Sequence, residues 1–470
     1  MPSAKTPADI ETRLFINGQF VESSDKKTFD LKSPSTHEVV AQVSEASESD
    51  TNAAVAAAKA AFPAWSALSP SGRAQYFKKL AALILEAHHE LAYLEAISMG
   101  RPVSKYFETF VAAESFNYYA EAGLTVLGTS SLNTPGHLNF TLKQPYGVVA
   151  AIIPWNVPIL FLAGKAAPAL MAGNTVVVKS SEKAPLTSAK IAQLVQEAGF
   201  PPGVFNIISG HGQTSGAILS SHMDVRVLSF TGSGRTGRMI QAAAAKSNLK
   251  NVILELGGKS PAIVFDDADL EKAAADTQHS IKWNSGQVCM ANSRIYVHES
   301  VAETFIKLFK EKFDAIVAGD PTDENTDHGP QADGIQYNTV RSYIEEGKAS
   351  GKRISGIDHD PTPNGYLIHP TIFVETKEDA KIMKEEIFGP VVNINTFKTE
   401  AEVLSKANDT EFGLYAAVFT KNIDRAMRVA KALEAGTVGV NCTSPSMAKD
   451  MPFGGYKASG VGREGFTSGE

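Results

Sequence analysis

The sequence contains very little cysteine, with only Cys289 and Cys442 in 470 residues. Two distant cysteines exclude the disulfide framework that stabilises small secreted domains, and they indicate a reducing compartment. The polar N-terminus lacks the apolar core of a secretion signal, so we expect a cytoplasmic protein. Cys442 is predicted to be a small buried residue.

Positive charge is not in excess, because 44 Lys and Arg residues stand against 51 Asp and Glu residues, a net charge of −7. This balance argues against a nucleic-acid groove or a basic membrane face. An uninterrupted apolar run is also missing. The most apolar stretch, residues 147–173, contains three prolines together with Asn156 and Lys165, which predicts a buried strand and helix rather than a membrane span. The eleven histidines show no metal-binding spacing, so no metal site is expected.

The length exceeds what one hydrophobic core supports, so two or three domains are expected. After Tyr146, short β-branched segments alternate with helical stretches, which predicts an α/β fold with a doubly wound parallel sheet. The predicted strands are Val148–Ile153, Thr175–Val178, Val204–Ile208, Val225–Ser229 and Ala262–Val264. A second set of strands and helices between residues 293 and 440 predicts another α/β domain.

Three elements are predicted before this region. Within Leu14–Leu31, the turn pair Asn17-Gly18 lies between Leu-Phe-Ile and Gln-Phe-Val, which indicates a β-hairpin. Asp50 and Thr51 are expected to cap an Ala-rich helix that ends near Phe62, and a long amphipathic helix is expected over residues 71–98. A polar stretch with prolines, residues 358–365, predicts a surface loop.

Cys289 is the first candidate for chemistry. It lies in a small, polar, Gly-containing segment, residues 284–290, unlike the apolar surroundings usual for a core cysteine. A lone thiol of this kind is a candidate nucleophile, because the thiolate attacks carbonyls efficiently near neutral pH. The alternative is a buried cysteine that acts as a small hydrophobic residue.

A glycine-rich segment follows the predicted strand at Val225. Gly232, Gly234 and Gly237 satisfy the pattern G-x-G-x-x-G, which lets a backbone approach a pyrophosphate at a helix N-terminus, although glycines also simply make tight turns. Glu255 lies where the pattern expects a ribose ligand. However, Glu255 stands between two leucines, which favours a raised pKa and the role of general base. A salt-bridged acid at a strand end is the alternative.

Three further segments fit a nucleotide site. Lys179 and Glu182 follow a strand and could hold ribose hydroxyls by charge-assisted hydrogen bonds. Glu386 lies beside Phe388 and could hold a second ribose, although a solvated acidic helix end is the commoner case. Asn156 lies between two prolines, so its amide is rigidly aimed, as in sites that stabilise oxyanions.

Six short motifs, spaced along the sequence, together resemble those of a known protein family. They are Pro154-Trp155-Asn156, Phe230-Thr-Gly-Ser233, Glu255-Leu-Gly-Gly-Lys-Ser-Pro261, Gly286-Gln-x-Cys289, Glu386-Ile-Phe-Gly-Pro390 and Pro452-Phe-Gly-Gly-Tyr-Lys457. In this order, and over almost the full length, the chain resembles the aldehyde dehydrogenase superfamily, in its hydrolytic NAD(P)-dependent branch.

The resemblance implies that Cys289 attacks an aldehyde, that Asn156 and the Cys289 N–H hold the oxyanion, and that Glu255 activates water to hydrolyse the thioester. Lys165 and Glu464 match positions associated with proton relay. NAD is implied as cofactor, preferred over NADP because Glu182 would meet a 2′-phosphate. The implied cofactor residues are Ile153, Trp155, Lys179, Glu182, Gly212, Gly216, Phe230, Gly232, Ser233, Leu256, Glu386 and Phe388.

Val157 and Gly164 stand where relatives often carry aromatic residues, so we expect a wide substrate tunnel that admits bulky or aromatic aldehydes. Its expected lining is Val157, Phe161, Trp283, Met447 and Phe453. Ser180 replaces a usual proline after Lys179, which puts the rigidity of that loop in doubt.

The resemblance also implies domains. Residues 1–126 and 146–257 are expected to bind NAD, residues 258–446 to carry the thiol, and residues 127–145 to form an oligomerisation hairpin. Residues 447–470 are expected to close the tunnel, and relatives continue beyond this point with a strand that joins a neighbouring subunit. Either the sequence is truncated here or assembly is weakened. The resemblance implies a homodimer or homotetramer, with a small-molecule aldehyde as the other partner.

Two alternatives stay open. In a CoA-acylating aldehyde dehydrogenase, CoA would take the acyl group and Glu255 would have no water to activate. A non-catalytic structural relative would have no need of Cys289, Glu255 and Asn156.

Overall fold

The computed structural model describes residues 10–358 and 365–465. Most of the loop predicted over residues 358–365 lies outside the described residues, as do the outer ends of the first and last predicted domains.

Eight strands form the first sheet, in the order β19-β11-β10-β7-β8-β9-β1-β2. The five strands from β11 to β9 are parallel, and the strands outside them run antiparallel to their neighbours. In chain order the strands are β1 (Leu14–Ile16), β2 (Gln19–Val21), β7 (Val148–Ile152), β8 (Thr175–Ser180), β9 (Phe205–Ser209), β10 (Val225–Thr231), β11 (Asn251–Glu255) and β19 (Gly460–Val461). Four of the five predicted strands are thereby confirmed.

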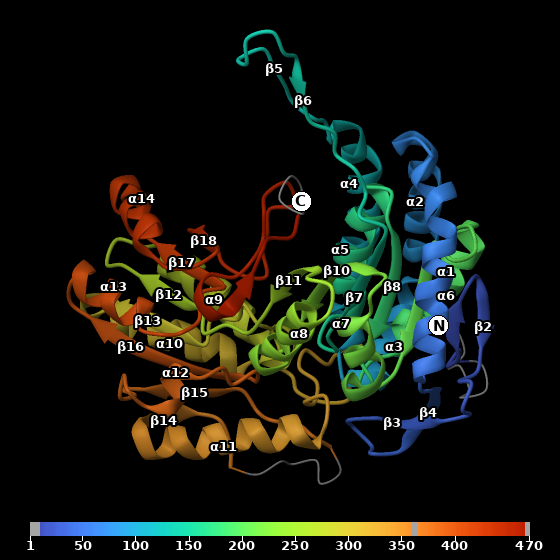
Figure 1. Cartoon of the computed structure of the whole chain (residues 1–470). Helices are drawn as coiled ribbons and strands as arrows, with labels where there is room; N and C mark the ends of the chain where they lie inside the picture. Colours follow the sequence, from blue (N-terminus) through green and yellow to red (C-terminus); the bar gives the residue numbers. More distant parts are fainter. Residues whose placement is uncertain (1–9, 359–364, 466–470) are drawn as a thin grey trace.

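Helices cover both faces of this sheet (Figure 1). In β7, Val149 and Ala151 pack with α2, α4, α5 and α6, whereas Val148 and Ala150 pack with α1, α7 and α8. The helices are α1 (Glu48–Ser66), α2 (Pro70–Glu86), α3 (His88–Met99), α4 (Glu108–Ala122), α5 (Pro158–Met171), α6 (Leu186–Ala198), α7 (Ala217–Ser221) and α8 (Gly234–Lys246). Burial on both faces explains why these strands are continuous apolar runs.

Seven strands form the second sheet, in the order β14-β15-β16-β13-β12-β17-β18, and all but β14 are parallel. They are β12 (Pro261–Val264), β13 (Arg294–His298), β14 (Lys352–Ser355), β15 (Thr371–Val374), β16 (Val391–Phe397), β17 (Tyr415–Phe419) and β18 (Thr437–Val440). The helices are α9 (Leu270–Lys282), α10 (Ala302–Asp314), α11 (Gly334–Ser350), α12 (Lys381–Lys384), α13 (Glu400–Asn408) and α14 (Ile423–Ala432). The predicted strand at Ala262 therefore opens this second sheet.

Two predictions near the N-terminus were wrong in detail, whereas the hairpin at Asn17-Gly18 is confirmed by pairing of β1 with β2. The cap of α1 is Ser47, which exchanges hydrogen bonds with Asp50 in a capping box, so Asp50 lies inside the helix. The long helix predicted over residues 71–98 is two helices, α2 and α3, separated at Ala87.

A two-stranded arm, β5 (Ser130–Ser131) and β6 (Asn139–Phe140), projects from the body of the molecule (Figure 1). A separate pair, β3 (Thr28–Lys32) and β4 (Val39–Ser44), lies near the N-terminus. Cys442 is exposed, which corrects the prediction of a buried residue, because the chain leaves β18 toward the surface at this point. Over residues 10–358 and 365–465, no helix combines the length and apolarity needed to cross a membrane.

Candidate active site

The loop before Cys289 has a left-handed backbone at three successive residues. The φ angles are 50° at Asn284, 55° at Ser285 and 73° at Gly286. Glycine is required at 286, since a Cβ there would lie 2.2 Å from the carbonyl carbon of Gly389. Side chains with a Cβ rarely adopt this conformation, so the loop stores strain that its surroundings must offset.

Hydrogen bonds from two other segments hold this loop. The Ser285 hydroxyl donates to the carbonyl of Gly329 at 2.8 Å, and the Ala332 N–H donates to Gln287 Oε1 at 2.9 Å. The Asn284 amide donates to the carbonyl of Asn156 at 2.7 Å. These bonds fix the loop against the chain on either side of it, and they include the predicted residue Asn156.

Asn156 lies between β7 and α5, and its side chain is buried. Its amide Nδ2 donates to the carbonyl of Gln287 at 2.9 Å, two residues before the thiol. The amide is thereby held beside the segment that carries Cys289. A fixed amide donor next to a nucleophile can stabilise an oxyanion that forms there.

The Cys289 thiol is partly exposed. Desolvation, reinforced by the negative charges of Glu386 and Glu255, raises its pKa to about 12. The thiol is therefore protonated near neutral pH in the structure as it stands. A proton acceptor or an added positive charge would be needed to generate the thiolate.

Glu255 ends β11, and its side chain is buried. Neither carboxyl oxygen has a hydrogen-bond partner among residues 10–358 and 365–465. Desolvation raises its pKa well above the usual range, the charge of Glu464 adds to this, and Lys165 and Arg463 oppose it. A buried carboxyl with free oxygens and a raised pKa suits general base chemistry.

Lys165 and Glu464, which the sequence places 299 residues apart, are in direct contact. Lys165 Nζ lies 2.5 Å from Glu464 Oε1 and 2.8 Å from the hydroxyl of Ser229. Ser229 also donates to Glu464. Sequence reasoning missed Ser229, for which the only signal was a polar residue among the apolar residues of β10.

Lys179 and Glu182 are also brought together, with 3.6 Å between Nζ and Oε2. Lys179 lies near the end of β8 and is buried, so desolvation lowers its pKa, whereas Glu182 is partly exposed. A buried cation and an accessible carboxylate at the end of a parallel strand are suited to hold the hydroxyls of a ribose.

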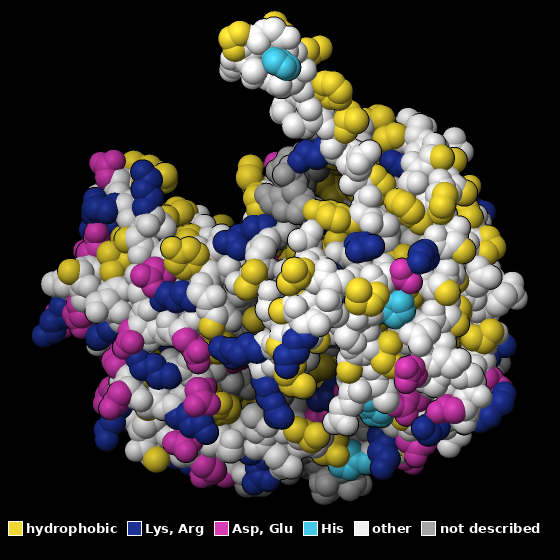
Figure 2. All heavy atoms as spheres, viewed as in Figure 1, with side chains coloured by type: hydrophobic (Ala, Val, Ile, Leu, Met, Phe, Trp, Pro, Cys, Tyr) yellow, Lys and Arg dark blue, Asp and Glu magenta, His cyan; other side chains and the backbone are white. Residues whose placement is uncertain are grey.

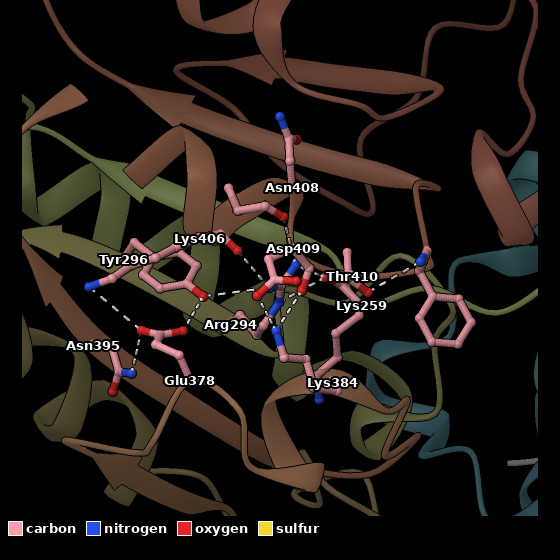
Figure 3. Close-up of polar contacts among 12 residues, drawn as sticks. Lys259, Arg294, Tyr296, Glu378, Lys384, Asn395, Lys406, Asn408, Asp409 and Thr410 are labelled. Carbon is pink, nitrogen blue, oxygen red and sulfur yellow. Dashed lines mark hydrogen bonds and ion pairs between the residues drawn. The ribbon is translucent and has the colours of Figure 1, made fainter. Parts of the chain in front are cut away.

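Glu386 accepts a hydrogen bond from the Gly258 N–H at 2.9 Å. Desolvation raises its pKa to about 7, although that bond and Lys259 act in the other direction. Arg294 anchors this segment, because its guanidinium donates to the Lys259 carbonyl and to the carbonyls of Lys406 and Ala407 at the end of α13 (Figure 3). The hydrogen bonds of Arg294 therefore hold the backbone that binds Glu386.

The glycine-rich segment joins β10 to α8. Ser233 caps the helix, since its hydroxyl accepts the Thr236 N–H at 3.3 Å. Gly237 lets α8 approach β11, because a Cβ there would lie 2.8 Å from the side chain of Leu256. Gly232 packs closely on the ring of Phe230, because a Cβ there would lie 2.4 Å from that ring, and the residue is partly exposed to solvent. This helix N-terminus can receive a pyrophosphate.

The remaining predicted cofactor residues flank the same end of the sheet. Ile153 is buried just after β7, and Trp155 packs its ring edge-on against Phe388 with centroids 5.4 Å apart. At Gly212 and Gly216 a Cβ would meet nothing within 4 Å, so space is open beside both. The residues present therefore fit a dinucleotide.

Four of the five predicted tunnel residues share one apolar cluster, against which Cys289 also packs. These four are Val157, Phe161, Trp283 and Phe453. Phe107, which sequence reasoning missed, stacks on Trp283 with ring centroids 5.4 Å apart. Met447 is exposed and lies outside the cluster.

Comparison with known proteins agrees with this geometry. The family model described as "Aldehyde dehydrogenase family" matches residues 20–469. An aldehyde dehydrogenase from Alternaria alternata is 46% identical over 96% of this chain and 92% of its own length.

Two solved structures are also similar. The NAD+ complex of an aldehyde dehydrogenase from Bacillus cereus has a TM-score of 0.94 and 40% identity, over 97% of this chain and 94% of that one. The P. syringae indole-3-acetaldehyde dehydrogenase AldA, in complex with NAD+ and IAA, has a TM-score of 0.94 and 39% identity, over 99% of this chain and 97% of that one. With the family model matching nearly the whole sequence and a relative at 46% identity, the chain belongs to the aldehyde dehydrogenase family.

Proposed function

We propose that the protein oxidises an aldehyde to a carboxylic acid with NAD, through a thioester on Cys289. The Cys289 thiol first loses its proton to solvent, which the positive charge of a bound nicotinamide would favour. The thiolate then attacks the aldehyde carbon to form a thiohemiacetal, whose oxyanion accepts hydrogen bonds from the Asn156 amide and the Cys289 N–H. NAD, when bound, supplies the acceptor for the hydride that leaves this carbon. Glu255 then takes a proton from water as the water attacks the thioester, which releases the acid and the thiol.

The observation that carries the proposal is the relation between Cys289 and Glu255. Glu255 keeps both oxygens free among the described residues, and its charge acts on the thiol. A base available to water favours hydrolysis over acyl transfer to CoA. The test is to follow NADH with a set of aldehydes and to identify the product: a carboxylic acid is expected, whereas acyl-CoA on addition of CoA, or no NADH with any aldehyde, would contradict the proposal.

We expect a preference for NAD over NADP because Glu182 would repel a 2′-phosphate. The variant Glu182→Ser should raise kcat/KM for NADP about tenfold relative to that for NAD, since solvent screens the partly exposed carboxylate and leaves a repulsion of about 1.4 kcal/mol. Initial rates with each cofactor measure this. Glu38→Ser, which removes an exposed carboxylate outside the site, is the matched control. An unchanged cofactor ratio in Glu182→Ser would contradict the role of this residue.

We expect bulky aldehydes to be better substrates than small ones. Gly164 on α5 has open space where a Cβ would lie, and apolar side chains surround Cys289. The value of kcat/KM for benzaldehyde should exceed that for acetaldehyde by about tenfold or more, because each buried apolar group adds binding energy. Val157→Phe should reduce this ratio by filling the space, and a preference for acetaldehyde in the wild type would exclude the wide tunnel.

The projecting arm supports assembly with further copies of this chain, as a homodimer or homotetramer. Figure 2 shows hydrophobic side chains gathered along the arm. The exposed apolar residues on and beside it are Leu124, Val126, Leu127, Leu132, Leu138, Phe140 and Leu142. Exposed apolar surface of this kind marks an interaction site. Cytoplasmic residence stays a prediction.

A further inference from the structure

Ser229 occupies a position on β10 at which its hydroxyl reaches two charged groups. The strand lies between β7 and β11 in the centre of the parallel sheet, and Ser229 is 6% exposed. The hydroxyl accepts a hydrogen bond from Lys165 Nζ at 2.8 Å and donates one to Glu464 Oε1. One hydroxyl thus bridges an ammonium on α5 and a carboxylate near the C-terminus.

The two charged groups differ in their access to water. The Lys165 side chain is fully buried, whereas that of Glu464 is 18% exposed. A buried ammonium requires acceptors for its N–H groups, and among the described residues the hydrogen bonds of Lys165 go to Ser229 and Glu464. The Phe161 ring centroid lies 5.8 Å from Lys165 Nζ, so a weak cation–π contact adds little to the stabilisation of the buried ammonium.

Both groups act on Glu255. Its raised pKa reflects desolvation first, then repulsion by Glu464, with attraction by Lys165 opposing them. The other titratable groups facing this place are Arg463, next to Glu464, and Tyr119 on α4, whose pKa is raised by desolvation and by the Glu464 charge. A shift of Lys165 or Glu464 would therefore change how readily Glu255 gains and loses a proton.

We propose that Ser229 is a positioning residue that holds Lys165 and Glu464 in the arrangement through which Glu255 exchanges its proton with solvent. This inference rests on the proposed function, because it takes Glu255 as the base that accepts a proton from water. That proton must leave before the next turnover, and Glu464 is the partly exposed member of the group. The hydrogen bonds of the Ser229 hydroxyl go to Lys165 and Glu464, and to neither the thiol nor a predicted cofactor residue.

The test compares three variants with the wild type. Ser229→Ala removes the hydroxyl, Ser229→Thr keeps it, and Ser98→Ala removes an equally buried hydroxyl that bonds only within α3. In the first turnover, NADH formation is followed by stopped flow. In later turnovers, carboxylic acid formation is followed by rapid quench, and kcat is measured across the neutral pH range. NAD affinity and thermal unfolding are measured on each protein.

Ser229→Ala is expected to form the NADH of the first turnover at the wild-type rate while acid formation in later turnovers falls about tenfold, as for a lost hydrogen bond to a charged group. Its pH profile for kcat should shift, and Ser229→Thr should keep acid formation within about threefold of the wild type. An unchanged rate and pH profile in Ser229→Ala would overturn the inference. An equal fall in first-turnover NADH formation and in later acid formation would also overturn it and indicate a structural role, as would the same fall in Ser98→Ala. Absence of NADH in the wild type would instead contradict the proposed function itself.

Discussion

Cys289→Ser is expected to lower kcat for aldehyde oxidation by a factor on the order of 10⁴ or more, which is typical of the loss of a catalytic nucleophile. A hydroxyl is a far weaker nucleophile than a thiolate at neutral pH, and no other cysteine can replace it, because Cys442 is exposed at the end of β18. NADH formation with the best aldehyde of a substrate screen measures the effect.

The matched control is Cys442→Ser, which changes the other cysteine of the chain and should leave the rate within about twofold. NAD binding by Cys289→Ser, measured by fluorescence titration, should persist, since the predicted cofactor residues lie outside the loop that carries Cys289, for example on β8, just before α8 and after α12. Wild-type turnover in Cys289→Ser would remove the basis of the proposed mechanism.

Glu255→Gln is expected to separate the two halves of the reaction. The amide cannot accept a proton from water, so thioester hydrolysis should fall by a factor of about 10² to 10⁴. The first NADH per active site should still form, as a burst followed by a slow phase. In the wild type the slow phase should quicken as pH rises through the raised pKa of Glu255, because the deprotonated carboxylate is the base. Glu255→Gln should lose this pH dependence.

Glu95→Gln is the control for this experiment. Glu95 is a fully buried carboxyl on α3 whose pKa is also raised, chiefly by desolvation, and it accepts a hydrogen bond from Tyr106 rather than lying beside Cys289. Its replacement should affect thermal unfolding more than turnover. If Glu255→Gln hydrolysed the thioester at the wild-type rate, another group would have to be the base.

The strands and their order of appearance could be predicted from the sequence, because buried parallel strands are short apolar runs between turns. Helix boundaries could not be predicted equally well. The break at Ala87 between α2 and α3 carries no glycine or proline, and it shows only in the backbone of Ala87, which leaves the helical region at φ −83° and ψ 9°. Similarly, Ser47 and Asp50 are both good caps, and the reciprocal capping box decides between them.

Within the candidate site, residues in motifs could be predicted and residues outside motifs could not. Phe107 directly precedes α4 and Ser229 lies in β10, and neither belongs to a recognisable motif. Their contacts with Trp283 and Lys165 form only when the chain folds. The left-handed backbone at Asn284 and Ser285 could not be predicted from the sequence either, because neither residue requires that conformation. Long-range contact, rather than local propensity, sets these features.

The short strand β19 has a consequence for how the protein is made. It pairs with β11 beside Glu255, and Glu464 just beyond it meets Lys165. The edge strand β19 of the first sheet therefore follows β11 in the sequence only after all seven strands of the second sheet. During synthesis, a ribosome must have released residues 460–464 before the catalytic centre can close, so a nascent chain lacking them should remain inactive however well its earlier parts have folded.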